Sequence, residues 1–200
     1  MTMPIDNAVH LCVDMQCIFA KGGIWETPWM ERVLPVIVDI VERCPERTVF
    51  TRFITPASPE EAQGQWRPYF ERWRVATRNA SGGAQLDLVP ELARFAPPAA
   101  VVDRATYSAF FRSPLANFLM QRDVRAVILS GAETDVCVLS TVLDAVNTGF
   151  RVVIVEDALC SSSDAGHDAL MTMYRVRFNQ QIDLVTAEEL RDLWHPERES

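Results

Sequence analysis

Short runs of apolar, often β-branched residues recur along the chain and alternate with segments in which apolar residues are spaced three or four apart. Several runs are apolar without interruption, which is typical of strands that are buried on both faces of a parallel sheet. The predicted strands are Ala8–Val13, Thr48–Phe53, Ala100–Val102, Ala126–Leu129, Arg151–Val155 and Ile182–Val185.

Helix signals lie between these runs. Apolar residues repeat at helix spacing after Pro35, which we expect to end any helix that begins earlier. A second helix is predicted over 138–148, with Gly149 as its C-cap, and Thr186 with Glu189 forms a capping-box pattern. The alternation of strands and helices predicts one α/β domain over residues 1–200, with a parallel sheet covered by helices.

Composition narrows the class of protein. The 200 residues are 48% hydrophobic and 23% charged, and the formal net charge is -8. This balance suits one globular domain and disfavours nucleic acid and anionic membranes as partners. No apolar run approaches the roughly 20 residues that span a bilayer, so we expect a cytoplasmic protein. An odd number of cysteines without a C-x-x-C pair favours reduced thiols, and the five are Cys12, Cys17, Cys44, Cys137 and Cys160.

The segment 54–90 is rich in proline and glycine and is too long for a plain connection. Within it, residues 65–79 combine aromatic side chains with arginines: Trp66, Tyr69, Phe70, Trp73, Arg67, Arg72, Arg74 and Arg78. One interpretation is a short amphipathic helix packed on the sheet or between subunits. The other is a lid that gives aromatic and cationic contacts to a small, anionic substrate.

Three chemically interesting residues follow predicted strands, where an open parallel sheet places its ligands. Asp14 follows the first strand, Arg104 the third and Cys137 the fourth. A thiol at a helix N-terminus lies near the positive end of the helix dipole, which favours the thiolate, so Cys137 is a candidate nucleophile. The alternatives are a buried packing cysteine and, for Asp14, a turn aspartate.

Three motifs together resemble the isochorismatase-like cysteine hydrolase family: residues 14–16 (DMQ), 101–110 (VVDRATYSAF) and 131–138 (GAETDVCV). The resemblance continues to Asp157 and covers most of the chain. It implies a three-layer α/β/α fold with a six-stranded parallel sheet in the order 3-2-1-4-5-6. In that order the first and fourth strands are neighbours, which places Asp14 beside Cys137.

The resemblance also implies roles. Cys137 would attack a carbonyl carbon, Asp14 would take and return the proton, and a cis peptide between Ala132 and Glu133 would precede the nucleophile. The backbone N–H groups of Glu133 and Cys137 would form the oxyanion hole. The pocket would be lined by Gln16, Phe19 and Tyr107. The implied reaction is cleavage of a C–N bond in a small amide, carbamoyl compound or cyclic imide, without a cofactor.

One position departs from the family pattern, because its triad lysine aligns with Arg104 and Lys21 is the only lysine in the chain. Arginine keeps the positive charge but does not release a proton. A pseudoenzyme or small-molecule binding protein is therefore one alternative. The other is an isochorismatase-type ether hydrolase, which is disfavoured because that branch lacks the cysteine.

The histidines and tryptophans of the sequence bear on metal binding and on assembly. His10, His167 and His195 lie far apart, and residues 51–55 lack the Asp-x-His pattern of related nicotinamidases, so no metal site is predicted. Related enzymes associate, and the tryptophans Trp25, Trp66 and Trp73 look exposed in the sequence. We therefore expect a homo-oligomer, a dimer or tetramer.

Overall fold

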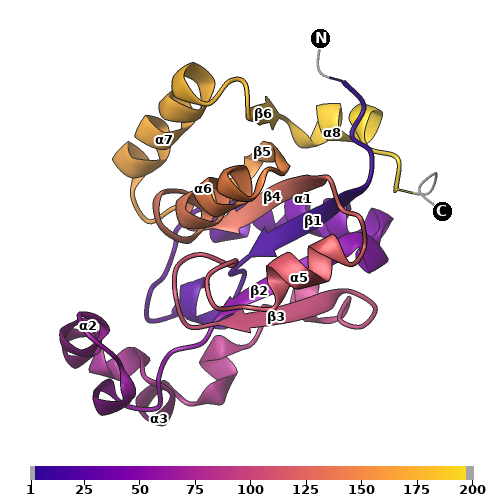
Figure 1. The fold of residues 1–200 in the computed structure, drawn as a ribbon. Helices are drawn as coiled ribbons and strands as arrows, with labels where there is room; N and C mark the ends of the chain where they lie inside the picture. Colours follow the sequence, from indigo (N-terminus) through magenta and orange to yellow (C-terminus); the bar gives the residue numbers. More distant parts are fainter. Residues whose placement is uncertain (1–2, 197–200) are drawn as a thin grey trace.

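The computed structural model describes residues 3–196. Its centre is a six-stranded sheet in which every pair of neighbouring strands is parallel, in the order β3-β2-β1-β4-β5-β6 (Figure 1). Both the fold class and the strand order are therefore confirmed. The strands are β1 (Ala8–Val13), β2 (Thr48–Phe53), β3 (Ala100–Arg104), β4 (Ala126–Ala132), β5 (Arg151–Cys160) and β6 (Ile182–Val185).

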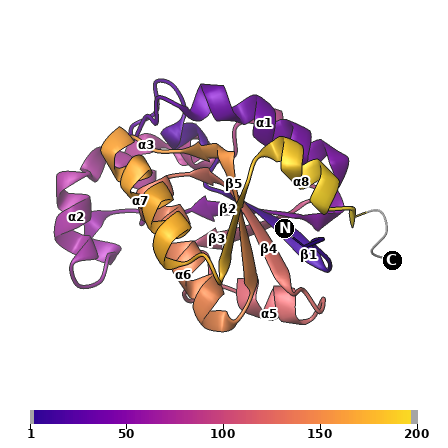
Figure 2. The same cartoon turned by 90° about the horizontal axis from the view of Figure 1, so that it is seen from above.

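Helices cover both faces of the sheet, with α1 and α8 on one face and α5, α6 and α7 on the other (Figure 2). Helices α2 and α3 lie beyond the edge of the sheet (Figure 1). The helices are α1 (Met30–Arg43), α2 (Trp66–Arg72), α3 (Arg78–Ser81), α4 (Pro90–Ala93), α5 (Leu115–Met120), α6 (Leu139–Thr148), α7 (Asp164–Arg177) and α8 (Ala187–Leu193).

Two apolar layers, one on each face of the sheet, hold the elements together. On one face Ile37 of α1 and Leu190 of α8 are fully buried with Ile128 of β4. On the other face Leu115 of α5 and Val142 of α6 are fully buried in the second layer. The continuous apolar strands thus reflect burial on both faces, as their sequences predict.

The neighbouring strands β1 and β4 set the position of the functional edge. Val13 pairs with Gly131 at the carboxyl ends of these strands. Gly131 has φ +108°, and a Cβ at this position would lie 2.0 Å from the carbonyl oxygen of Val13. Only glycine fits this close approach, so the chain can leave β4 beside the end of β1.

Several element boundaries differ from the predictions. Helix α1 contains Pro35 in its interior instead of beginning after it. The buried Met30 and Val33 anchor its first turns, so packing compensates for the hydrogen bond that proline removes. Strands β3, β4 and β5 run two, three and five residues beyond their predicted ends. The predicted C-cap and capping box are both confirmed: Gly149 is left-handed, and Thr186 and Glu189 form reciprocal hydrogen bonds.

Within residues 3–196, no helix has the length and hydropathy that a membrane crossing requires.

Candidate active site

Asp14, Arg104 and Cys137 meet at the carboxyl edge of the sheet. Asp14 directly follows β1, Arg104 ends β3, and Cys137 lies in a single π-helical turn, Thr134–Val138, that leads from β4 into α6. The structure therefore brings together three residues that are more than thirty positions apart in the chain. Figure 1 shows the ends of these strands on one side of the molecule.

Asp14 is held as a buried hydrogen-bond acceptor. Its side chain is 0% exposed, and its residue has φ +51° at the end of β1. Thr51 Oγ1 donates to Asp14 Oδ1 at 3.0 Å, and Arg104 Nη2 donates to Oδ2 in a close ion pair. A buried carboxylate needs such partners, since an unpaired charge away from water is strongly destabilising.

The thiol of Cys137 lies within hydrogen-bonding reach of both Asp14 and Arg104. Burial raises the pKa of Cys137 well above its ordinary value, and the negative charge of Asp14 adds to this increase while Arg104 opposes it. Burial also raises the pKa of Asp14, and again Arg104 opposes the increase. The expected thiolate is therefore wrong for the resting site, where the sulfur keeps its proton beside a buried proton acceptor.

The burial of Cys137 explains why the helix dipole does not decide its pKa. The residue is 5% exposed and lies before the first residue of α6, Leu139, in the π-helical turn. Thr141 Oγ1 donates to the carbonyl oxygen of Cys137 at 2.7 Å and fixes this turn. The peptide bond between Ala132 and Glu133 is cis, as the resemblance implies.

Arg104 fills the position of the family lysine with a longer side chain. Its guanidinium is 0% exposed and lies 5.2 Å from the centre of the Phe53 ring. Burial opposes its charge, but Asp14 and Cys137 together outweigh this effect and raise the pKa of Arg104. Among the described residues, its Nε and Nη1 atoms have no hydrogen-bond partner. The guanidinium therefore stays charged and forms an ion pair with one carboxylate, that of Asp14.

A cavity of about 530 Å³ opens over Cys137. Six aromatic residues line it, together with two glutamates and a serine. The lining residues are Phe19, Gly23, Ile24, Trp25, Glu26, Phe53, Tyr69, Trp73, Tyr107, Glu133, Val136, Cys137 and Ser162. Phe19 and Tyr107 thus lie where the sequence places them, at a cavity that contains the candidate nucleophile.

Gln16 does not line this cavity. Its side chain is fully buried, and it donates to the carbonyl oxygens of Phe53 and Leu86 and accepts from the N–H of Phe53 at 2.7 Å. These bonds connect the end of β1 to β2 and to the segment that follows α3. Gln16 therefore positions the backbone around the site and has no free polar atom for a substrate.

Sequence reasoning missed part of the cavity wall and misjudged the aromatic and basic segment. Trp25 and Glu26 come from the loop before α1, and no sequence motif marks them as part of a site. Tyr69 of α2 and Trp73, which follows this helix, also line the cavity, so the aromatic half of the lid interpretation agrees with the structure. The centres of the Trp25 and Trp73 rings are 6.0 Å apart in an edge-to-face arrangement.

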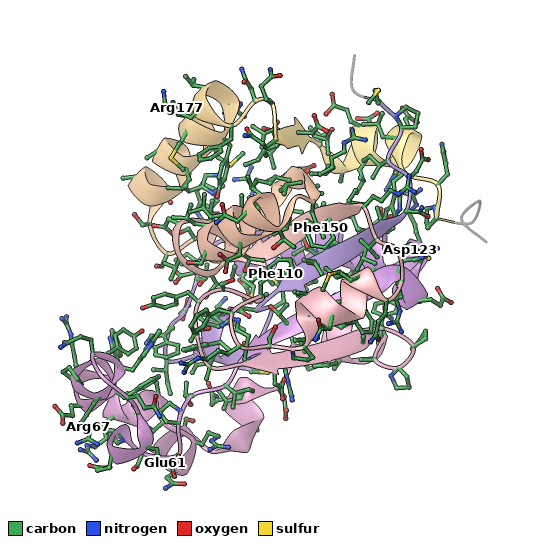
Figure 3. The ribbon with its side chains drawn as sticks, viewed as in Figure 1. Glu61, Arg67, Phe110, Asp123, Phe150 and Arg177 are labelled. Carbon is green, nitrogen blue, oxygen red and sulfur yellow. The ribbon has the colours of Figure 1, made fainter. Side chains whose placement is uncertain are left out.

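The cationic half of that interpretation is wrong. Arg67 donates to the carbonyl oxygen of Glu60, and Figure 3 shows it with Glu61 at the outer end of the molecule. Arg74 and Arg78 form exposed ion pairs with these same two glutamates, at 3.5 and 3.8 Å. None of the arginines of this segment lines the cavity, and Arg74 and Arg78 pair with carboxylates outside it.

The tryptophans that suggested an oligomer pack on other aromatic rings of the same chain. Trp25 and Trp66 are half-buried and contact Phe53, with ring centres 6.0 and 6.1 Å apart. Their exposure thus gives no argument for association, and the homo-oligomer stays a prediction.

His10 and His167 have side-chain partners within the fold, and Cys160 is buried in the sheet. His10 Nε2 and Ser130 Oγ are 2.7 Å apart inside the sheet, and burial lowers the pKa of His10 to about 3. His167 Nδ1 lies 2.9 Å from Thr134 Oγ1. Burial raises the pKa of Cys160, which lies in β5. Among residues 3–196, no group of three or more His, Cys, Asp or Glu side chains is placed to hold a metal ion.

Comparison with known proteins agrees with this geometry. A model of the isochorismatase domain matches residues 8–187. The chain belongs to the isochorismatase family. A cysteine hydrolase from Pseudomonas syringae pv. phaseolicola 1448A has the same fold, with a TM-score of 0.79 at 20% identity over 95% of this chain and 96% of that one.

Two curated relatives of this isochorismatase-family chain differ in what their names say. A ureidoacrylate amidohydrolase from Variovorax paradoxus is 38% identical over 79 residues, which are 40% of this chain and 31% of that protein. A protein from Arabidopsis thaliana named a probable inactive nicotinamidase is 24% identical over 169 residues, 82% of this chain and 85% of that protein. The first curated relatives are thus matched over about a third of their length, 36% and 31%.

Proposed function

We propose that this protein is a metal-independent cysteine hydrolase that cleaves the C–N bond of a small amide, carbamoyl compound or cyclic imide. The observation that carries the proposal is the thiol of Cys137 at the floor of a cavity, within hydrogen-bonding reach of the Asp14 carboxylate, which is paired with buried Arg104. A nucleophile beside an oriented proton acceptor is the arrangement that acyl transfer requires. The family includes a relative named as an amidohydrolase, which supports the same class of reaction.

In the first half of the reaction, Cys137 Sγ forms a bond to the substrate carbonyl carbon while its proton passes to Asp14. The carbonyl oxygen becomes an oxyanion, for which the backbone N–H groups of Glu133 and Cys137 are the proposed donors. When this intermediate collapses, the C–N bond breaks and the amine leaves with the proton from Asp14. The product is a thioester on Cys137.

In the second half, Asp14 takes a proton from water, and the resulting hydroxide oxygen bonds to the thioester carbon. The C–S bond then breaks, the proton returns to sulfur, and the carboxylic acid or carbamate leaves. Arg104 supplies charge throughout: because a guanidinium does not deprotonate, it favours ionised Asp14 and thiolate without carrying a proton.

The pseudoenzyme alternative rests on the missing lysine and on the family's relative that is named probably inactive. An intact, buried ion pair beside Cys137 argues for turnover, because arginine supplies the same charge at the same carboxylate. The ether-hydrolase alternative remains disfavoured by the cysteine itself.

The test measures hydrolysis of a panel of amides, ureides and cyclic imides, by ammonia release for primary amides and ureides and by loss of the closed ring for cyclic imides. It is combined with intact mass and peptide mapping. We expect turnover by the natural chain, an acyl adduct on Cys137, and no turnover by Cys137→Ala. Cys160→Ala, another buried cysteine, is the matched control and should keep activity. Asp14→Asn should lower kcat/KM by about 10²–10⁴-fold. Turnover by Cys137→Ala, or none by the natural chain across the panel, would contradict the proposal.

A further inference from the structure

The cavity over Cys137 combines aromatic side chains with acidic ones. Six aromatic side chains line it, and the described part of the lining contains two glutamates but no lysine, arginine or histidine. The nearby cation of Arg104 is fully buried and bonded to Asp14, so these two charges offset each other and neither contacts a ligand in the cavity. The cavity therefore carries a net negative charge from Glu26 and Glu133.

Each of the two carboxylates accepts a hydrogen bond from a backbone N–H group. Glu26 Oε2 accepts from the N–H of Gly22 at 2.8 Å, and Glu133 Oε1 accepts from the N–H of Ser162 at 3.0 Å. Glu133 also lies close enough to Tyr107 that its charge contributes, after burial and the nearby Cys137, to raising the pKa of that phenol. One carboxylate thus lies at the reactive end of the cavity and the other beside Trp25.

Several of the aromatic rings that line the cavity with these carboxylates contact one another. Trp25 contacts Phe19 and Trp73, with ring centres 5.8 and 6.0 Å apart. It also lies 6.3 Å from Tyr69, measured between ring centres. The negative faces of aromatic rings attract organic cations, and the attraction is largest where water is excluded. A carboxylate-bearing substrate would meet like charge on both walls and no cationic partner.

We propose that the substrates of this site are amides that carry an organic ammonium group, held among the Trp25, Trp73 and Phe19 rings with Glu26 as counter-charge. This inference rests on the proposed function, because a substrate requires hydrolysis. The preference of the cavity for a cation can nevertheless be measured as binding, without turnover. It separates this chain from its relative named for ureidoacrylate, whose substrate is a carboxylate.

The experiment compares two amides of the same shape on Cys137→Ala, which cannot form a thioester. Trimethylglycinamide carries a quaternary ammonium, and 3,3-dimethylbutanamide replaces its nitrogen with carbon; malonamate supplies the anionic case. Tryptophan fluorescence reports the Kd values. We expect trimethylglycinamide to bind at least about tenfold more tightly than its neutral isostere, and malonamate to bind most weakly.

Variants that remove one negative charge test whether Glu26 causes the preference for the cationic amide. Glu26→Gln keeps the acceptor for Gly22 but removes the charge, and it should reduce the preference for the cation by about threefold or more. Glu71→Gln, on the exposed side of α2 and outside the lining, changes the net charge equally and should leave the preference unchanged. A second readout needs no variant. Each of the three amides is tested for its ability to protect Cys137 of the natural chain from an added alkylating reagent.

The outcomes separate the two proposals. Equal or tighter binding of the neutral amide or of malonamate would overturn the cationic preference, even if the natural chain hydrolyses amides. An equal loss of preference in Glu26→Gln and Glu71→Gln would also overturn it, because the effect would then come from overall charge. Selective cation binding without hydrolysis of any amide would support this inference and refute the proposed function.

Discussion

Replacement of Arg104 by methionine tests whether the buried ion pair organises the site. Arg104→Met keeps an unbranched side chain but leaves Asp14, which is 0% exposed, with Thr51 and Cys137 as its remaining partners. Removing one member of a buried pair costs about 3–5 kcal/mol, because the other charge stays away from water. For a chain of this size, about 2–4 °C per kcal/mol gives a decrease in Tm of roughly 6–20 °C.

The pH dependence of this loss identifies its cause. Without the cation, the pKa of Asp14 rises further above its unfolded value, since burial is then opposed only by neutral hydrogen bonds. A carboxyl whose folded-state pKa is raised loses stability as pH rises, so the difference between Arg104→Met and the natural chain should be larger at about pH 7 than at about pH 5. Asp14→Asn combined with Arg104→Met should recover part of the loss, because neither buried charge remains.

Arg52 provides the control for this experiment. It forms a two-pronged ion pair with Asp103 at 2.7 and 2.8 Å on the adjacent strand β2, but both partners are partly exposed. Arg52→Met should therefore cost about 1 kcal/mol or less and show little pH dependence. Urea unfolding at the two pH values measures all four proteins. If Arg104→Met costs no more than Arg52→Met, the buried pair does not stabilise the fold as argued.

Three further predictions concern the framework around the site. Burial lowers the pKa of His10 to about 3, so stability should be constant above the unfolded value and fall below about pH 6.5, by up to about 1.4 kcal/mol per pH unit; His10→Asn should remove this part of the slope in urea unfolding. Gly131→Ala should give little folded protein by circular dichroism, since its Cβ would meet Val13, whereas normal melting would show that the strand end can shift. Thr186→Ala should cost about 1 kcal/mol through loss of the cap to Glu189, and an unchanged Tm would mean that α8 frays without consequence.

Local signals in the sequence predicted the six strands and several of the helices, and the family resemblance supplied the strand order. The buried strands are continuous apolar runs, and the caps at Gly149 and Thr186 use residues whose backbone or side-chain preferences act over a few positions. Element ends were less predictable. Pro35 is tolerated inside α1 because the helix packs on the core, and β5 continues through polar Glu156 and Asp157. Tertiary packing overrides local preference at such positions.

The sequence by itself determined the strand and helix pattern and, through its motifs, the residues Asp14, Arg104 and Cys137. Only the tertiary structure decided their chemical state: burial and the charge of Asp14 raise the pKa of Cys137, and Arg104 offsets only part of this increase. It also decided the cavity, where Trp25 and Trp73 from distant segments meet. Spacing along a chain reports which residues share an element, whereas desolvation and the sum of charges depend on which elements lie side by side.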